Sequence, residues 1–454
     1  MQPVTAVVAA AVLAMLAAVT VFSPVHPPAP AENLPVIAER LSGDPADLVA
    51  TRLPDRYRAL PARAAAESVA ADADVALALS ESPASKDSDM PIEAGLAQLA
   101  ALDAASVRDV LVELPRETVE WLAVLFPATM GNLAGAPLEV RVAANAIRVA
   151  GTVARSRSWP SPDRPWTGED RDTRPDFQRV IDGGHQLIHF DPLANDGEGS
   201  WVELVGDLST ASTVGVLVPG GSASVTNDNF TRYSLRADSF VSASDGDLAM
   251  VVWAGAPFPS GWVEEASASW AQDAAVELVA FMADLRGQLG ADVPITLAGH
   301  SYGGAVVGVA ETYELEADRV LHVASAGAGF GVWSPQDYSF PCRERYDLMA
   351  PGDPIGYVQN IPDFTGLGHG IEVSRMPGVK RLVTGSVPDD PDARDEIDRT
   401  LGSMGITGKE IGGVHAHSEV FIPRSDAWQS MLSVFTMGAP RLLAEQPPAL
   451  PGCG

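Results

Sequence analysis

The fold is decided by residues 293–311, which read VPITLAGHSYGGAVVGVAE. A run of β-branched and apolar residues stops at Gly299, and small residues with helical character follow Ser301. Glycines at 299 and 303 flank the serine, so the stretch has the form G-x-S-x-G between a predicted strand and a predicted helix. A nucleophile elbow requires this setting, because small neighbours permit the strained backbone that exposes the serine hydroxyl. Ser301 is therefore the predicted nucleophile; the alternative is a strand–helix turn that merely uses Gly and Ser.

The sequence around this stretch predicts the α/β class. Beyond about residue 180, short apolar runs rich in β-branched residues alternate with helical segments. Such alternation predicts a mostly parallel sheet with helices on both faces, whose ligands bind at the carboxyl ends of the strands. The predicted strands are residues 214–220, 248–255, 294–299, 320–327, 346–352 and 380–385.

A serine nucleophile needs a base, and the base needs an orienting acid, in the chain order Ser, acid, His for this architecture. Asp353 follows the strand at 346–352 and a Pro-Gly turn, so it is the predicted acid. It could instead be a simple turn residue before Pro354. Asp347 lies within the strand and Asp363 in a longer loop, which makes both less suitable.

The histidine must come later in the chain. His417, just before the predicted last helix, is the predicted base, and His415 is the reserve; His369 also follows the acid. The acidic insertion at 386–410 stands where a short loop would be expected. An alternative is that His415, His417 and Glu419 present metal ligands on one face of a strand. We expect no metal.

An oxyanion requires two preorganised N–H donors. The backbone of Tyr302, directly after the nucleophile, would supply one. The loop within VLVPGGSASVTNDN, residues 216–229, would supply the other from Gly221 or Ser222. A plain glycine turn is the alternative for this loop.

The domain boundaries follow shifts in composition. Residues 1–31 hold an uncharged apolar run from Ala6 to Phe22 and a Pro-rich stretch, which predict a secretory signal or a membrane anchor and hence export. The predicted parts are this leader, a helical segment at 32–151, a Pro-rich linker at 152–176, the α/β domain at 177–445 and a tail at 446–454. We expect the helical segment to pack against the α/β domain and help to wall the pocket; packing far from Ser301 is the alternative.

Composition excludes several functions. The formal net charge of −29 argues against nucleic-acid partners and against electrostatic docking on anionic lipid. The glycines in ASAGAGFGV lack a suitable acidic ribose partner, so we expect no dinucleotide and no other cofactor. Cys342 and Cys453 could pair in an oxidising compartment, although the sequence alone leaves their pairing open.

The elbow, the VPGG loop and the PGDP loop together resemble the α/β-hydrolase superfamily of esterases and lipases. FPATMGNLAGAPLEVRVAANAIRV at 126–149, GHSYGG and HSEVF more narrowly resemble an actinobacterial family of exported α/β-hydrolases of uncharacterised substrate. The resemblance spans roughly residues 120–440 and implies Ser301, Asp353 and His417 as nucleophile, acid and base. The resemblance names no substrate. From the elbow in its strand–helix context we expect a serine hydrolase that cleaves a carboxylic ester, with a small-molecule or lipid ester as its substrate. An acyltransferase with the same triad and a non-catalytic binding protein on this fold are the alternatives.

Overall fold

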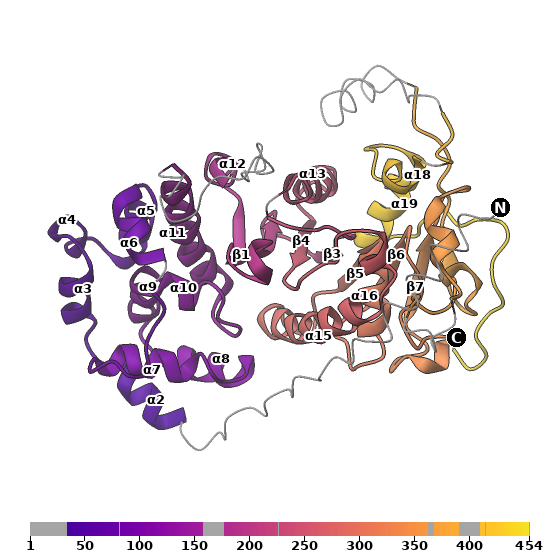
Figure 1. The fold of residues 1–454 in the computed structure, drawn as a ribbon. Coiled ribbons are helices and arrows are strands. Elements are labelled where there is room, and N and C mark those ends of the chain that lie inside the picture. Colours follow the sequence, from indigo (N-terminus) through magenta and orange to yellow (C-terminus); the bar gives the residue numbers. More distant parts are fainter. Residues whose placement is uncertain are drawn as a thin grey trace.

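The computed structural model describes residues 34–80, 82–157, 177–225, 227–361, 367–389, 409–413 and 415–453. A group of N-terminal helices lies beside a twisted sheet that carries further helices above and below it (Figure 1). The apolar run at residues 6–22 and most of the predicted linker lie outside the described residues. In the described part of the chain, no helix is both long enough and apolar enough to cross a membrane.

One sheet of eight strands forms from the described residues, in the order β1-β2-β4-β3-β5-β6-β7-β8. All neighbouring pairs from β4 to β8 are parallel, whereas β2 pairs antiparallel with both β1 and β4. The strands are β1 (Gln186–Asp191), β2 (Ser200–Val205), β3 (Thr213–Val218), β4 (Leu248–Ala254), β5 (Ile295–His300), β6 (Arg319–Val323), β7 (Glu344–Leu348) and β8 (Lys380–Arg381). The predicted α/β class is confirmed, and each of the six predicted strands overlaps an observed strand. β6, β7 and β8 end earlier than predicted, and β8 has only two residues.

The first two strands were not among the predicted strands. β1 mixes buried and half-buried side chains without strict alternation, and β2 contains the charged residue Glu203 among its apolar residues. Glu203 is nevertheless buried, and it accepts a hydrogen bond from the Ser234 hydroxyl at 2.9 Å. A pattern interrupted by a charge in this way does not read as a buried strand, although the fold provides the charge with partners.

Helices cover both faces of the sheet (Figure 1). α13 (Asn229–Ser242) and α19 (Asp426–Phe435) pack on one face, where the Phe240 and Trp428 rings stack with centroids 5.2 Å apart. α15 (Ser269–Leu289) and α16 (Tyr302–Ala310) pack on the other face. The apolar strands are therefore shielded from water on both sides, as continuous parallel strands require.

The N-terminal part is entirely helical within its described residues and has its own apolar core. Its last helix, α11 (Leu138–Arg157), runs past the predicted boundary at residue 151 and lies along β1. The Asn145 side-chain amide donates to the Leu187 carbonyl oxygen of β1 at 2.9 Å. The other helices are α2 (Leu34–Leu41), α3 (Ala46–Arg52), α4 (Asp55–Arg58), α5 (Ala62–Ala70), α6 (Ala73–Ser80), α7 (Pro91–Leu99), α8 (Ala104–Val112), α9 (Arg116–Leu125) and α10 (Pro127–Met130).

A buried ionic cluster also joins the helical segment to the sheet domain. The Asp284 carboxylate on α15 accepts hydrogen bonds from Arg141 at 3.0 Å, Arg108 at 3.1 Å and the backbone N–H of Gly135 at 3.0 Å. Asp284 is 3% exposed and Arg141 is also buried, so both charges depend on this contact. The helical segment is therefore packed on the sheet domain, as predicted, and not a detached stalk.

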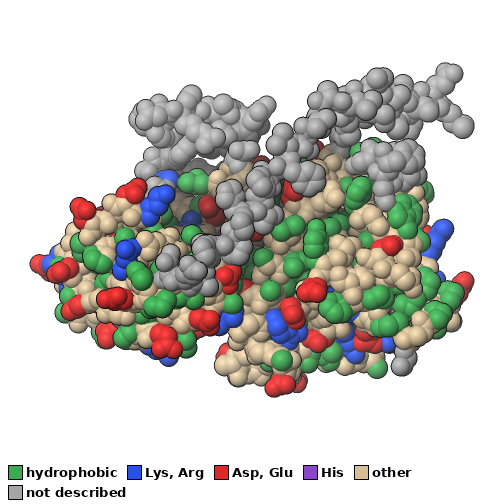
Figure 2. Space-filling view, turned by 90° about the horizontal axis from the view of Figure 1, so that it is seen from below, with side chains coloured by type: hydrophobic (Ala, Val, Ile, Leu, Met, Phe, Trp, Pro, Cys, Tyr) green, Lys and Arg blue, Asp and Glu red, His purple; other side chains and the backbone are tan. Residues whose placement is uncertain are grey.

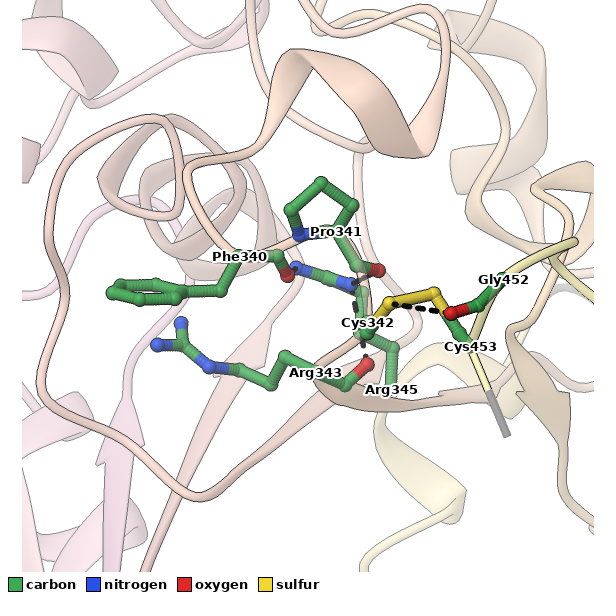
Figure 3. The surroundings of a disulfide bond; sticks show 7 residues. All are labelled: Phe340, Pro341, Cys342, Arg343, Arg345, Gly452 and Cys453. Carbon is green, nitrogen blue, oxygen red and sulfur yellow. Dashed lines mark hydrogen bonds between the residues drawn. A yellow bond between two sulfur atoms is a disulfide. The ribbon is translucent and has the colours of Figure 1, made fainter.

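Cys342 and Cys453 form a disulfide with their Cα atoms 5.2 Å apart (Figure 3). It ties the C-terminal tail to the loop that enters β7, where Arg345 donates to the carbonyl oxygens of Phe340 and Pro341. The pairing that the sequence left open is thus present in the structure.

Acidic side chains are spread over the surface. On the face shown in Figure 2, red carboxylate side chains are dispersed among neutral and hydrophobic ones, with basic side chains in small groups between them. The excess of acidic over basic side chains in the sequence gives the formal net charge of −29.

Candidate active site

Ser301 occupies a strained turn between β5 and α16. Its backbone has φ 56° and ψ −123°, a conformation that costs free energy for any residue other than glycine. The turn is tight, because a Cβ on Gly299 would lie 2.4 Å from the Gly303 carbonyl oxygen. A Cβ on Gly303 would lie 2.2 Å from the Pro219 carbonyl oxygen. Both glycines of the G-x-S-x-G pattern are therefore required by the backbone packing.

The structure brings Ser301, His417 and Asp353 together in a line. His417 Nε2 lies 2.8 Å from the Ser301 Oγ, and His417 Nδ1 lies 3.1 Å from each carboxylate oxygen of Asp353. The Asp353 side chain is fully buried, whereas the His417 side chain is 26% exposed. The imidazole can therefore accept the serine proton at one nitrogen while the carboxylate holds the other.

Asp353 is fixed by the turn in which it lies. It follows β7 and caps the short helix η4 (Pro354–Val358), where its side chain accepts the Ile355 N–H at 2.9 Å. Pro354 is thus the first residue of this helix, so the Asp-Pro pair serves as a helix cap as well as a turn.

His417 reaches the site despite the acidic insertion before it. Ser386 and Glu410 form an antiparallel bridge, and the Val387 N–H donates to the Lys409 carbonyl oxygen at 2.9 Å. The chain therefore leaves and returns at one point, and the length of the insertion does not displace the residues after it. His417 lies on the single turn of α18 (Ala416–Glu419).

The other candidates are placed elsewhere. Asp347 is buried within β7, and Asp363 lies outside the described residues. His369 is buried, and its Nε2–H donates to the Glu265 carbonyl oxygen at 2.7 Å. His415 is exposed, it precedes the first residue of α18, and no hydrogen bond joins its side chain to Ser301 or Asp353 among the described residues.

The alternative metal site needed a strand at residues 415–419, and the structure has a helix there instead. Among the described residues, no three His, Cys, Asp or Glu side chains form a group that could hold a metal ion.

The predicted oxyanion donors differ in whether their N–H groups already have a hydrogen-bond acceptor. The Tyr302 N–H opens α16, and N–H groups in a first helical turn have no acceptor within the helix. The Ser222 N–H already donates to the Pro259 carbonyl oxygen at 2.7 Å, so it is not free for a ligand. Gly221 remains the predicted second donor. The backbone of the neighbouring Gly220 lies close to the nucleophile, because a Cβ on Gly220 would be 2.9 Å from the Cβ of Ser301.

A hydrogen-bonded relay beneath the site was not predicted from the sequence. The Gly220 N–H donates to the Tyr233 hydroxyl at 2.7 Å, and this hydroxyl lies 2.6 Å from His300 Nδ1. His300 Nε2 lies 2.9 Å from the His417 carbonyl oxygen. Because a carbonyl only accepts, Nε2 carries the proton and Nδ1 accepts from Tyr233. The burial of His300, together with the nearby charge of His417, holds its pKa well below the usual value, which favours this neutral form.

A cavity of about 310 Å³ opens over Ser301. It is lined by Gly220, Gly221, Asn229, Arg232, Tyr233, Arg236, Glu265, His300, Ser301, Pro354, Ile355, Val358, His417 and Ser418. None of these residues belongs to the N-terminal helices, so the expectation that the helical segment walls the pocket is wrong for its described residues. The reason is geometric: α11 packs on β1, at the edge of the sheet, whereas Ser301 follows the central strand β5.

Comparisons with known proteins agree with this architecture. Residues 195–363 match a family described as alpha/beta hydrolase, and no curated protein matches the chain. A serine hydrolase without a lid from Xanthomonas campestris is 16% identical, with 40% of this chain and 78% of that chain covered and a TM-score of 0.25. The esterase domain of a Rhodothermus marinus protein is 14% identical, with 36% and 75% covered and a TM-score of 0.24. A lipase/esterase from Lactobacillus plantarum is 14% identical, with 35% and 75% covered and a TM-score of 0.23.

With TM-scores of 0.25 or less, these structural likenesses support no conclusion about this chain. The family match spans β2 to β7, including the elbow and the loop of Asp353. It contains the parallel strands β3 to β7 and the strained serine at the end of β5. The chain therefore has the α/β-hydrolase fold, and residues 195–363 are similar to the family described as alpha/beta hydrolase.

Proposed function

We propose that the protein is a serine hydrolase that cleaves a carboxylic ester through an acyl-enzyme at Ser301. One observation carries this proposal: the strained Ser301 hydroxyl lies 2.8 Å from His417 Nε2, whose other nitrogen faces the buried Asp353. A serine hydroxyl is a weak nucleophile unless a positioned base removes its proton, and this arrangement provides that base. The cavity of about 310 Å³ favours a small-molecule ester.

In the proposed acylation step, Ser301 Oγ attacks the ester carbonyl carbon while His417 Nε2 takes its proton. The carbonyl oxygen becomes an oxyanion that accepts hydrogen bonds from the N–H groups of Tyr302 and Gly221. The bond between the carbonyl carbon and the alcohol oxygen then breaks, and the leaving alkoxide takes the proton from His417. Asp353 holds the imidazole in the required tautomer and stabilises its charge in the transition state.

In the proposed deacylation step, water attacks the acyl-enzyme. His417 takes a proton from the water, and the bond to Ser301 Oγ breaks. The proton then returns to the serine, and a free carboxylic acid leaves. Release of the acyl group to an alcohol instead of water would make the protein an acyltransferase with the same triad.

Labelling with a fluorophosphonate probe tests the proposal. The wild-type protein should be labelled at Ser301, as located by mass spectrometry, and should hydrolyse para-nitrophenyl butyrate. Ser301→Ala should lose the label and should lower kcat by about 10⁴- to 10⁶-fold, with a residue of activity from the oxyanion donors. Ser260→Ala is the matched control, because Ser260 is exposed and does not line the cavity. It should keep both properties.

Two results would contradict the proposal. One is a folded wild-type protein that is neither labelled nor active on any ester in a panel of acyl-chain lengths. The other is a label that persists in Ser301→Ala. The first result would favour a binding protein on this fold.

We also propose that the protein is exported. The apolar run at residues 6–22 and the disulfide between Cys342 and Cys453 both support this, because disulfides persist in oxidising compartments. Alkylation of free thiols in the protein, carried out directly on the cells that make it, tests whether Cys342 and Cys453 are paired there. Free thiols at both cysteines in a cytoplasmic fraction that holds most of the protein would contradict it.

A further inference from the structure

Two arginines from one helix line the cavity over Ser301. Arg232 and Arg236 are four residues apart on α13, so they lie on the same side of the helix. Both line the cavity together with Ser301 and His417. Arg232 is exposed, whereas Arg236 is only 9% exposed. The catalytic cavity of a strongly acidic protein therefore has a basic wall.

Arg236 differs from the other buried arginines. Arg141 pairs with Asp284, Arg345 pairs with Glu311, and Arg148 lies 3.8 Å from Asp191. Within the described residues, neither Arg236 nor Arg232 forms an ion pair with a carboxylate. A buried charge is costly unless it is paired. The fold therefore places on the cavity wall a guanidinium that still lacks a counter-charge.

The contacts of Arg236 hold its guanidinium in place. Its central carbon lies 4.1 Å from the centroid of the Phe421 ring and 4.6 Å from that of the Tyr233 ring. Such ring contacts offset part of the cost of burying the charge, but they involve the face of the guanidinium and not the N–H donors in its plane. The Arg232 Nη1 donates to the Asn229 side-chain oxygen at 3.3 Å, which directs this second arginine toward the same wall.

Tyr233 contacts both Arg236 and the residue that precedes the nucleophile. The Tyr233 hydroxyl bonds His300, the residue before Ser301. After burial and the charge of His417, the charges of Arg236 and Arg232 contribute to the low pKa of His300, so both act at the elbow. Among the described residues that line the cavity, Glu265 is the one carboxylate. It lies beside Gly221, and its charged neighbours are His417 and Glu264. The α13 wall and the Glu265 wall are thus electrostatically different.

We propose that Arg232 and Arg236 form a subsite for an anionic group of the substrate, a carboxylate or a phosphate, so that the preferred ester carries a negative charge. This inference rests on the proposed ester hydrolysis at Ser301. The guanidinium of Arg236 would bind the anion with two parallel hydrogen bonds, and the more exposed Arg232 would add a second cation. The net charge of −29 elsewhere would otherwise repel such a substrate, which makes a local basic wall necessary.

A pair of matched esters tests this subsite. In para-nitrophenyl hemisuccinate, a carboxylate replaces the terminal methyl group of para-nitrophenyl butyrate. The wild-type protein should show the higher kcat/KM with hemisuccinate. Arg236→Gln should lower the ratio of the two kcat/KM values by about 10- to 100-fold, the usual effect of losing a charge-assisted pair. Arg236→Lys should keep part of the preference, because it retains the charge but not the planar fork.

If Arg236→Gln does not fold, Arg232→Gln provides the test, because Arg232 is exposed and its replacement should not affect folding. Arg232→Gln should lower the ratio of the kcat/KM values for hemisuccinate and butyrate several-fold. Arg375→Gln is the control, because its side chain is 69% exposed and lies outside the cavity lining. A loss of stability alone would reduce turnover of both esters equally, so the ratio reports on the subsite and not on packing.

The outcomes separate this inference from the proposed function. Turnover of butyrate with no preference for hemisuccinate, and no change of the ratio in either glutamine variant, would overturn the subsite and leave ester hydrolysis intact. If neither ester is turned over, calorimetric titration of the wild-type protein with succinate and with inorganic phosphate decides the matter. Binding of either anion that is lost in Arg232→Gln would support the subsite and tell the two anions apart, whereas no binding of either would overturn it.

Discussion

The imidazole of His300 donates a hydrogen bond to the backbone carbonyl oxygen of His417, with Nε2 and the oxygen 2.9 Å apart. The same ring accepts from Tyr233, which in turn accepts the Gly220 N–H. One relay therefore joins the loop of the predicted oxyanion donor Gly221, the residue before the nucleophile and the backbone of the predicted base. The second residue of G-x-S-x-G thus has a positioning role in this chain.

Tyr233→Phe tests this relay. The substitution removes only the hydroxyl, and it leaves the buried Gly220 N–H and His300 Nδ1 without their partner. The free energy of unfolding should fall by about 1–3 kcal/mol, the cost of an unsatisfied buried polar group. The kcat/KM for para-nitrophenyl butyrate should fall about tenfold under conditions where the variant is fully folded, because both loops lose their alignment. Urea denaturation and steady-state kinetics give the two quantities.

Tyr313→Phe is the matched control for this change. Tyr313 is 45% exposed and does not line the cavity, so the variant should match the wild-type protein in both measurements. A Tyr233→Phe protein that loses stability but keeps its full kcat/KM would show that the relay only supports the fold.

The parts of the site that sequence could predict are those set by local patterns. The elbow is local: a strand, a serine flanked by glycines and a small-residue helix are contiguous, and their backbone packing requires them. Asp353 follows from the same logic, since it comes directly after a buried strand. His417 follows an insertion of a length that no local pattern explains, and only the bridge between Ser386 and Glu410 shows that the two ends of this insertion lie together.

The parts that sequence could not predict depend on contacts between distant residues. Tyr233 and His300 are 67 positions apart, and no local pattern indicates that they meet. Whether Arg236 has a counter-charge is likewise a property of the folded chain, as is the use of the Ser222 N–H by Pro259. The same holds for the helical segment: its apolar faces predict packing, but only the position of β1 at the sheet edge shows that it packs away from Ser301.

Asp284→Asn tests how the helical segment is held. The substitution removes the charge that pairs with the buried Arg141 and with Arg108. An uncompensated buried guanidinium costs about 3–5 kcal/mol, so the free energy of unfolding should fall by that amount. The kcat/KM of the folded variant should remain that of the wild-type protein, because Asp284 does not line the cavity. Urea denaturation followed by tryptophan fluorescence gives the stability.

Asp292→Asn is the comparison for this change, since Asp292 is exposed shortly after the same helix and its replacement should have little effect on stability. If Asp284→Asn is as stable as Asp292→Asn, the ionic cluster does not hold the two parts together. A change in kcat/KM at full folding would instead show that the helical segment acts on the site.

Asp347→Asn tests a pH dependence of stability. Asp347 is buried in β7, and burial raises the pKa of its carboxyl from 3.8 to about 7, with Arg381 opposing the shift. Between these two values the folded protein holds a proton that the unfolded chain releases, so this group makes the free energy of unfolding fall as the pH rises from about 4 to about 7. Above pH 7 the carboxyl is ionised in both the folded and the unfolded protein, so the free energy of unfolding no longer falls on account of this group.

The Asp347→Asn variant has no proton to release at this position, and any packing cost of the asparagine is the same at every pH. The stability of Asp347→Asn relative to the wild-type protein should therefore increase by roughly 3–4 kcal/mol between pH 4 and pH 8, as measured by urea denaturation across that range. A difference between the two proteins that stays constant with pH would show that Asp347 is ionised in the folded protein throughout.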